Sequence, residues 1–226
     1  PTFDDVIPGE WYYDAVQYAV QNGFMEGESD KTFAPDNAMT RVALVTALYR
    51  LDGPKKTDTP ITFSDVAASA PYGDAVKWAA ANGIAAGYGD GTFRVNDSVT
   101  RQQMAAMLQR YAKYKGRNIE NTADLSADAD ASEVADWARG AVAWAVSEGL
   151  IAGTDNSLLM PGGPATRAQT AAVLMRYING SALEKRASDY VSQFVKGNFS
   201  DFYKDCDAQL QQSITQDKLV KGWDTI

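Results

Sequence analysis

The sequence contains no histidine and a single cysteine, Cys206. Without histidine the chain cannot form Ser-His-Asp or Cys-His catalytic triads or histidine-ligated metal sites. One cysteine excludes an intrachain disulfide and a cysteine-rich zinc site, so we expect neither a metal nor another cofactor. We interpret Cys206 as a small buried residue rather than a nucleophile. The chemistry that remains is that of carboxylates, or binding.

Positive charge and long apolar runs are also scarce. The 226 residues include 21 Lys and Arg against 29 Asp and Glu, which gives a net charge of −8. Such an acidic chain repels phosphate backbones, so we expect no nucleic-acid partner. No apolar run approaches the roughly 18 residues of a membrane span, and Pro1 begins no signal peptide. We therefore expect no membrane insertion, and an export signal that has already been removed.

One motif occurs three times along the chain. Its markers are a Thr-Arg pair, a glycine, an Ala-Val pair and an aromatic residue, each recurring after 60 and then 66 residues. The Thr-Arg pairs are Thr40-Arg41, Thr100-Arg101 and Thr166-Arg167. Several markers in register across three copies indicate a repeat protein. Phe3-Asp4-Asp5-Val6 also matches Phe63-Ser64-Asp65-Val66, and Leu125-Ser126 is a weaker third match.

Each copy predicts a helix, a loop and a second helix. In the second copy Ala75, Val76 and Ala79 form the apolar stripe of a helix. Asn82-Gly83 is expected to end this helix. The second helices begin at the Thr-Arg pairs. Thr100 and Thr166 are each followed three residues later by Gln, which is a capping box, whereas the first copy keeps only the threonine cap.

The predicted architecture is all-α, with three helix-loop-helix repeats around a pseudo-threefold axis. A single unit of about 50 residues cannot bury both helices, whereas three copies can share a core. Phe33, Phe93 and Leu159 stand at matching loop positions, and we expect them to plug the loops onto that core. The predicted modules span 1–53, 61–116 and 123–180, followed by a helical segment over 181–226.

The repeat resembles the S-layer homology domain. The resemblance covers residues 3–180 and is most specific in the second copy, in Phe63-Ser64-Asp65-Val66, Gly87-Tyr88-Gly89-Asp90-Gly91-Thr92-Phe93 and Thr100-Arg101. It implies a three-pronged helical assembly outside a bacterial cell, associated with the cell wall or the S-layer. Its implied partner is a pyruvylated secondary cell-wall polysaccharide or modified peptidoglycan, with other S-layer subunits as further partners.

The arginines after the helix caps are the first candidates for ligand contact. A helix N-terminus offers unpaired N–H groups and a positive dipole end, and Arg41, Arg101 and Arg167 add a cation to each. Together they predict an anion site suited to the carboxylate of a pyruvyl ketal. The alternative is that each arginine pairs with an aspartate such as Asp5 or Asp65 and merely holds modules together.

Aromatic residues near the first helices fit a sugar ligand. Trp11, Tyr72 and Trp137 begin these helices, where a ring can stay exposed, whereas we expect Trp78 and Trp144 to be core. The further candidates for glycan contact are Lys77, Tyr88 and Asp90. The family resemblance places pockets between neighbouring modules. On that basis we expect Arg41 to work with Tyr72 and Lys77, and Arg101 to work with Trp137.

Two acidic stretches invite other interpretations. Asp90 lies in a glycine-rich turn that lacks the Gly-Lys-Thr ending of a phosphate-binding loop. Asp128-Ala129-Asp130-Ala131-Ser132 resembles the start of a calcium loop, but Glu133 and Arg139 stand where such a loop needs Gly and Glu. We therefore expect a displayed turn and a solvated acidic insertion, and no metal at either.

The tail departs from the repeat. Residues 181–226 predict amphipathic helices and are similar to the opening of a small α+β domain of unknown function, of the DUF3887 type. The markers are Phe199-Ser200-Asp201-Phe202 and the pair Leu219 and Trp223. We expect this segment to be an incomplete domain.

The function that these observations favour is a non-catalytic wall anchor that binds glycan in grooves between repeats. The alternative is a packing unit of a surface lattice without direct glycan binding. A glycosidase needs two carboxyl groups set apart at a defined distance, and the recurring positions carry arginines and aromatics instead. We therefore expect no enzymatic activity.

Overall fold

The computed structural model describes residues 2–57, 60, 62–67, 69–153 and 158–180. The chain divides into two compact units, Pro1–Tyr177 and Ile178–Ile226, and the account below concerns the first. The predicted helices of the tail, and Cys206, lie outside the described residues.

The described part of the chain is helical, which confirms the all-α prediction. It contains no strand, only isolated β-bridges. None of the described helices combines the length and the apolar character that crossing a membrane requires. The elements are α1 (Tyr13–Gln21), α2 (Arg41–Asp52), α3 (Gly73–Ala81), α4 (Arg101–Tyr114), the short 3₁₀ turns η1 (Leu125–Ala127) and η2 (Ala131–Glu133), α5 (Asp136–Ser147) and a last helix over 167–180.

The predicted caps set the start of each second helix. The hydroxyl of Thr100 accepts the N–H of Gln103 at 3.3 Å, and the Gln103 side chain accepts the N–H of Thr100 at 2.9 Å. Thr166 and Gln169 repeat both bonds. Thr40 caps α2 by accepting the N–H of Ala43, whose methyl side chain cannot accept a bond in return. All three helices therefore begin at the arginine after the threonine.

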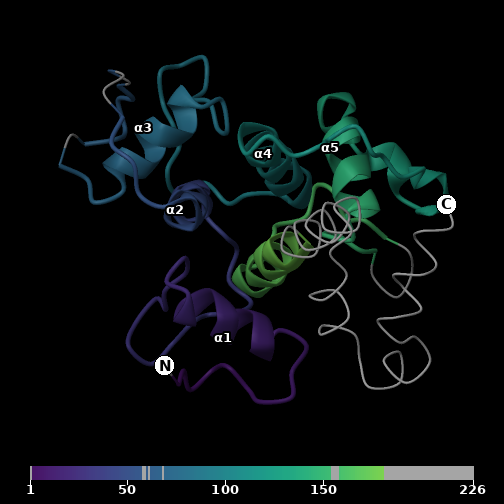
Figure 1. Cartoon of the computed structure of the whole chain (residues 1–226), viewed down its shortest axis with the longest axis horizontal. Helices are drawn as coiled ribbons and strands as arrows, with labels where there is room; N and C mark the ends of the chain where they lie inside the picture. Colours follow the sequence, from purple (N-terminus) through teal and green to yellow (C-terminus); the bar gives the residue numbers. More distant parts are fainter. Residues whose placement is uncertain (1, 58–59, 61, 68, 154–157, 181–226) are drawn as a thin grey trace, which may run out of the picture. The chain divides into compact units, whose positions relative to one another are not determined.

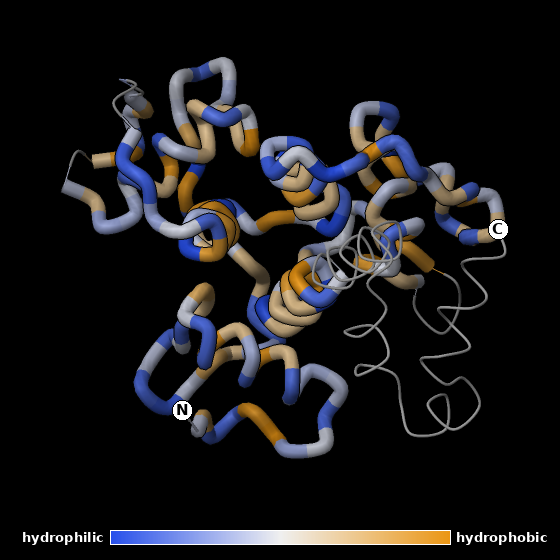
Figure 2. Tube along the Cα trace, in the orientation of Figure 1, coloured by the Kyte–Doolittle hydropathy of each residue, from blue (hydrophilic) through white to orange (hydrophobic). Residues whose placement is uncertain are grey.

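Helices of different repeats pack against one another. α3 of the second repeat packs on α2 of the first, and α5 of the third repeat packs on α4 of the second. Figure 1 shows α2, α4 and the helix over 167–180, drawn in green, between the first helices of the repeats. Hydrophobic and hydrophilic positions alternate along these second helices (Figure 2). Each interface between repeats is therefore part of the core.

The equivalent positions Leu44, Met104 and Thr170 are all buried on the second helices. The hydroxyl of Thr170 donates to the carbonyl of Thr166 at 2.9 Å and lies 3.6 Å from the sulfur of Met104. Because these bonds satisfy the hydroxyl, the core tolerates a polar group at this depth. Residues 60 and 66 positions apart in the sequence thus occupy equivalent places around one shared core.

Three backbone hydrogen bonds close a ring between the repeats. The N–H of Met39 donates to the carbonyl of Ala165, that of Ala165 to Val99, and that of Val99 to Met39. Each distance is 2.8 Å. Every repeat donates one bond and accepts one, so the ring has a threefold pattern. This ring lies directly before the second helices and fixes where each of them starts.

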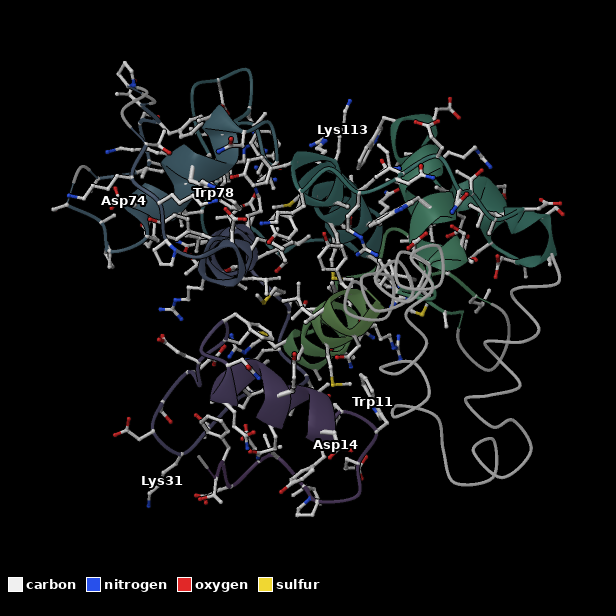
Figure 3. All side chains as sticks on the ribbon, in the orientation of Figure 1. Trp11, Asp14, Lys31, Asp74, Trp78 and Lys113 are labelled. Carbon is white, nitrogen blue, oxygen red and sulfur yellow. The ribbon has the colours of Figure 1, made fainter. Side chains whose placement is uncertain are left out.

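The expected core residues are confirmed. Trp78 and Trp144 are 1% and 0% exposed, and Figure 3 shows Trp78 beside α3 and α2. Phe33, Phe93 and Leu159 are buried, as expected for loop plugs. Phe33 and Phe93 also contact the phenylalanine that opens their own repeat, Phe3 or Phe63, with ring centroids 5.8 and 5.3 Å apart.

Candidate functional site

Each repeat's loop is held by an aspartate of the same repeat and an arginine of the preceding one. In the second repeat, the Asp65 carboxylate accepts the N–H of Phe93 at 2.7 Å and that of Arg94 at 2.6 Å. The Arg41 guanidinium donates from Nε to the carbonyl of Phe93 at 3.0 Å and from Nη2 to that of Ala86 at 2.9 Å. Bonds of this charge-assisted kind are the stronger class of protein hydrogen bond.

The other two repeats build the same arrangement. Arg101 donates to the carbonyls of Leu159 and Ala152, and Arg167 donates to those of Phe33 and Glu26. The arginine of the first repeat therefore holds the second, that of the second holds the third, and that of the third holds the first. Burial lowers the pKa of all three guanidinium groups, but their ordinary value lies far above neutrality and they stay cationic.

The third repeat corrects the interpretation of its acidic stretch. Asp130 is not part of a solvated insertion: it is 8% exposed, and its carboxylate accepts the N–H groups of Leu159 and Met160 at 2.8 and 2.7 Å. It is the counterpart of Asp5, which accepts from Phe33 and Ala34 at 2.8 and 2.7 Å. The residue after each plug has positive φ: Ala34 at 59°, Arg94 at 57° and Met160 at 51°.

The anion site expected at the helix N-termini was wrong, and so was the alternative of an ion pair with Asp5 or Asp65. Asp5 and Asp65 bind loop N–H groups, so they are not the ion-pair partners of the arginines. The N-termini of the second helices are not open to an anion either, because the N–H groups of Arg41 and Val42 donate to Asp97 and Val95 of the next repeat, at 2.9 and 3.1 Å. The equivalent bonds at the other helices are Arg101 to Gly163, Gln102 to Pro161, Arg167 to Asn37 and Ala168 to Pro35.

Three equivalent grooves border these arginines in the described part of the chain. Each combines the buried arginine, a second arginine from the C-terminal half of a second helix, a loop segment, and an aromatic residue from the start of a first helix. We name them by the repeat that supplies the loop: the first groove (residues 24–27), the second groove (residues 85–88) and the third groove (residues 150–153).

The second groove is cationic and aromatic. It has a volume of about 160 Å³ and is lined by Arg41, Arg110, Tyr88 and Trp137. The Arg41 guanidinium lies 5.0 Å from the centroid of the Tyr88 ring. Neither Arg41 nor Arg110 has an acidic side chain within ion-pair distance among the described residues. Trp137 is 59% exposed, so its ring is open to a ligand.

The third groove has the same composition. It measures about 510 Å³ and is lined by Arg101, Arg176 and Trp11. Arg176 donates to the carbonyl of Leu150 at 3.1 Å, and Nη1 of Arg101 is 3.4 Å from the side-chain oxygen of Gln169. Trp11 is 62% exposed at the edge of the first repeat (Figure 3).

The first groove differs in charge. It measures about 340 Å³ and is lined by Arg167, Arg50, Tyr72 and Glu26. Arg50 forms an ion pair with the carboxylate of Glu26 at 2.9 Å. Arg167 lies 3.9 Å from the carboxylate of Glu28. Both arginines of this groove therefore have an acidic partner.

The predicted combinations of groove residues were wrong, although most of the predicted residues line a groove. Arg41 meets Trp137 and Tyr88 instead of Tyr72 and Lys77, Arg101 meets Trp11 instead of Trp137, and Tyr72 belongs with Arg167. α3 packs on α2 and α5 packs on α4, so Tyr72 and Trp137 each lie one groove away from the predicted one. Which aromatic residue lies beside which arginine therefore depends on how the three repeats pack together.

Two predicted residues line none of these three grooves. They are Lys77, which lies on α3, and Asp90, which is exposed in its turn. Asp90 accepts from the Thr92 hydroxyl at 2.6 Å, from Arg94 at 3.0 Å and from the Thr92 N–H at 3.0 Å, and these hydrogen bonds lower its pKa to about 2. Asp90 thus braces its own turn.

Sequence reasoning missed the second arginine of each groove. Arg50, Arg110 and Arg176 recur at the same spacings of 60 and 66 as the Thr-Arg pairs, so the signal was present. Each lies nine residues after the arginine that begins its own helix. The two arginines of one helix line different grooves.

Comparison with known proteins supports the resemblance. The S-layer homology domain matches residues 2–41, 62–105 and 128–171, more than half of the chain. The chain belongs to the S-layer homology family. The three matched stretches each include an aspartate that holds a loop and the buried arginine at the start of a second helix, whereas Arg50, Arg110 and Arg176 lie just beyond them.

Several curated relatives share this three-repeat region. The chain is 33% identical over 76% of its length to "Amylopullulanase" of Thermoanaerobacterium thermosulfurigenes and 32% identical over 73% to "Surface-layer 125 kDa protein" of Lysinibacillus sphaericus. It is 27% identical over 71% to "Cellulosome-anchoring protein" of Acetivibrio thermocellus. The matches span 9%, 14% and 38% of these relatives, so the shared region is less than half of each.

Proposed function

We propose that the three S-layer homology repeats attach a surface protein to the bacterial envelope by binding acidic cell-wall glycan in the grooves. The observation that carries the proposal is the repeated combination of two arginines and one exposed aromatic ring. The pairs are Arg41 with Arg110 beside Trp137 in the second groove, and Arg101 with Arg176 beside Trp11 in the third. The ligand we propose is a wall polysaccharide with pyruvyl ketals; modified peptidoglycan is the second candidate.

The chemistry of the second groove suits a sugar acid. A guanidinium donates in a planar fork that matches a carboxylate, and two of them give a strong local positive charge in an otherwise acidic protein. Nη1 of Arg41 has no hydrogen-bond partner among the described residues, whereas Nε and Nη2 hold the loop. The exposed face of Trp137 offers an apolar platform beside it for a pyranose ring.

The relatives support a role that does not depend on catalysis. Proteins named as an amylopullulanase, a surface-layer protein and a cellulosome-anchoring protein have this region in common. A region shared by proteins with such different names fits a common attachment function better than any one reaction. We therefore propose that this region is not an enzyme, that it acts outside the cell, and that its partners are wall polymer and neighbouring surface proteins.

The test is sedimentation with purified cell walls, before and after chemical removal of the pyruvyl groups. Arg110→Ala and Trp137→Ala are the informative variants because both side chains line the second groove without holding a loop. Lys113→Ala removes the same charge from the same helix outside the groove (Figure 3) and is the matched control. We expect Lys113→Ala to bind like wild type and both groove variants to bind less.

The alternative is a packing unit that stabilises a surface lattice without touching glycan. The bonds of Arg41, Arg101 and Arg167 to loop carbonyls favour it, because they give these arginines a purely structural task. Wall binding that is absent in wild type would favour this alternative. Binding that survives depyruvylation and both groove variants would point to a different wall ligand.

A further inference from the structure

Both arginines of the first groove have an acidic neighbour: Glu26, which lines the groove, and Glu28, which lies beside it. The carboxylate of Glu26 is 2.9 Å from Arg50, and that of Glu28 is 3.9 Å from Arg167. Asn37 donates to both oxygens of Glu28, at 3.3 and 3.2 Å, which fixes this second acid in place. Two acids thus face the two arginines that would otherwise receive a ligand carboxylate.

The second groove has the same backbone without the acids. The carbonyls of Glu26 and Ala86 are equivalent, since each accepts Nη2 of the buried arginine of the preceding repeat in the ring. The side chains at this position differ: Glu26 carries a carboxylate, whereas Ala86 carries only a methyl group. At the position of Glu28 stands Tyr88, whose ring lies 5.0 Å from Arg41 and 4.0 Å from Arg94. One groove is neutralised by its own loop, and the other is not.

We propose that Glu26 is a specificity-determining residue: it acts as an internal counter-ion that makes the first groove a poor site for an anionic glycan, while the second groove binds it well. This inference rests on the proposed function and goes beyond it, because it assigns unequal roles to equivalent grooves. The second groove then binds acidic polymer more tightly than the first.

The electrostatics indicate the size of the effect. A ligand carboxylate entering the first groove must displace Glu26 from Arg50 and then stay beside a like charge. Exposed ion pairs are weak, and Glu26 is 71% exposed, so the penalty is graded and does not abolish binding. A difference of about tenfold in Kd corresponds to about 1.4 kcal/mol, a magnitude that one such exchange can supply.

The experiment is a reciprocal exchange at the two equivalent positions, measured by calorimetry. The probe is a hexose monosaccharide with a 4,6-O-pyruvyl ketal, and its methyl ester serves as the neutral comparison. In a Trp11→Ala/Trp137→Ala background, in which the second and third grooves lack their platforms, Glu26→Ala should tighten binding of the probe about tenfold. Glu26→Gln should do the same, and the ester should not distinguish these variants.

The reverse exchange uses a Trp11→Ala background, which leaves the second groove as the main site. Ala86→Glu should place a carboxylate beside Arg110 and weaken binding of the probe about tenfold. Glu120→Ala removes the same charge as Glu26→Ala from an exposed acid that lines none of the three grooves. Made in the Trp11→Ala/Trp137→Ala background, it is the control for net charge and should leave Kd unchanged.

The outcomes separate the two proposals. If wild type binds the probe but Glu26→Ala and Ala86→Glu leave Kd unchanged in their backgrounds, the counter-ion role is wrong and the proposed function stands. If Glu120→Ala has as large an effect as Glu26→Ala, net charge explains the change and the counter-ion role is again wrong. If wild type binds neither the probe nor pyruvylated walls, both proposals are overturned.

Discussion

Arg41 and Asp65 hold the same residue, Phe93, by its two backbone polar atoms. The guanidinium donates to the carbonyl at 3.0 Å, and the carboxylate accepts the N–H at 2.7 Å. Because Arg41 comes from the first repeat and Asp65 from the second, the loop conformation of one repeat depends on contact with its neighbour. The opposite charges act through a peptide segment and form no direct ion pair.

Replacing Arg41 should destabilise the fold. Arg41→Ala leaves the carbonyls of Phe93 and Ala86 without their donors in a buried place, which we expect to cost about 2–4 kcal/mol of the free energy of unfolding. Urea unfolding followed by circular dichroism measures it. Arg94→Ala, which removes an exposed arginine on the same loop, should destabilise the fold much less. Equal effects of the two variants would show that the loop contacts of Arg41 are not stabilising.

Asp65 should make stability depend on pH. Burial alone would raise its pKa, but hydrogen bonds from the N–H groups of Phe93, Arg94 and Val95 outweigh burial and lower it. A group with a depressed pKa in the folded state stabilises fully above its unfolded value of about 3.9, and the stabilisation is lost as pH falls through the lower folded value. At pH values below about 4, the free energy of unfolding should therefore decrease as the pH is lowered.

Asp65→Asn is the variant that isolates this contribution. An amide can accept through one oxygen only, so the variant should lose about 1–3 kcal/mol at neutral pH and show a weaker loss of stability in acid. Thermal unfolding between pH 2.5 and 7 gives both quantities. A variant whose pH profile is parallel to that of wild type would rule out Asp65 as a source of the acid sensitivity.

Two glycines of one loop should respond differently to alanine. A Cβ at Gly87 would collide with the ring of Phe63 and lie 2.8 Å from the carbonyl of Thr92, whereas a Cβ at Gly89 would have nothing within 4 Å. Gly87→Ala should therefore cost about 1–3 kcal/mol, and Gly89→Ala should stay within about 0.5 kcal/mol of wild type. Denaturant midpoints of the two variants test this, and a neutral Gly87→Ala would contradict the close packing.

Two tryptophans should separate stability from binding. Trp144 is 0% exposed, and Trp144→Ala should cost about 3–5 kcal/mol through cavity formation. Trp11 is 62% exposed in the third groove, and Trp11→Ala should change stability by less than about 0.5 kcal/mol while it reduces wall binding. Melting temperatures and wall sedimentation of both variants distinguish the roles. Unchanged sedimentation of Trp11→Ala would exclude its ring from ligand contact.

Local features of the fold could be predicted from the sequence. The caps at Thr100 and Thr166, the buried Trp78 and Trp144 and the loop plugs follow from residue type and spacing, which act within a few residues. The role of Asp130 could not be found, because the third repeat reaches this position with a different spacing from the markers around it. The sequence around it also resembled a different kind of loop.

The composition of the grooves was only partly predictable for a different reason. Each groove is assembled from three places in the chain, such as Arg41, Ala86 and Trp137, and no local rule says which first helix packs on which second helix. The spacing of Arg110 marked it as part of the repeat, but not as a neighbour of Arg41. The ion pair of Glu26 with Arg50 could not be predicted either, because only the fold brings these two residues together.

The cyclic order of the arginine contacts means that no repeat is terminal. An open solenoid can be lengthened, and it needs special capping repeats at both ends. Here the contact of Arg167 with Phe33 joins the third repeat back to the first, so a fourth copy would find no free junction. The same closure means that the cyclic order of the repeats matters, but not the repeat with which the chain begins. A circular permutant beginning at the second repeat would rebuild the same three junctions.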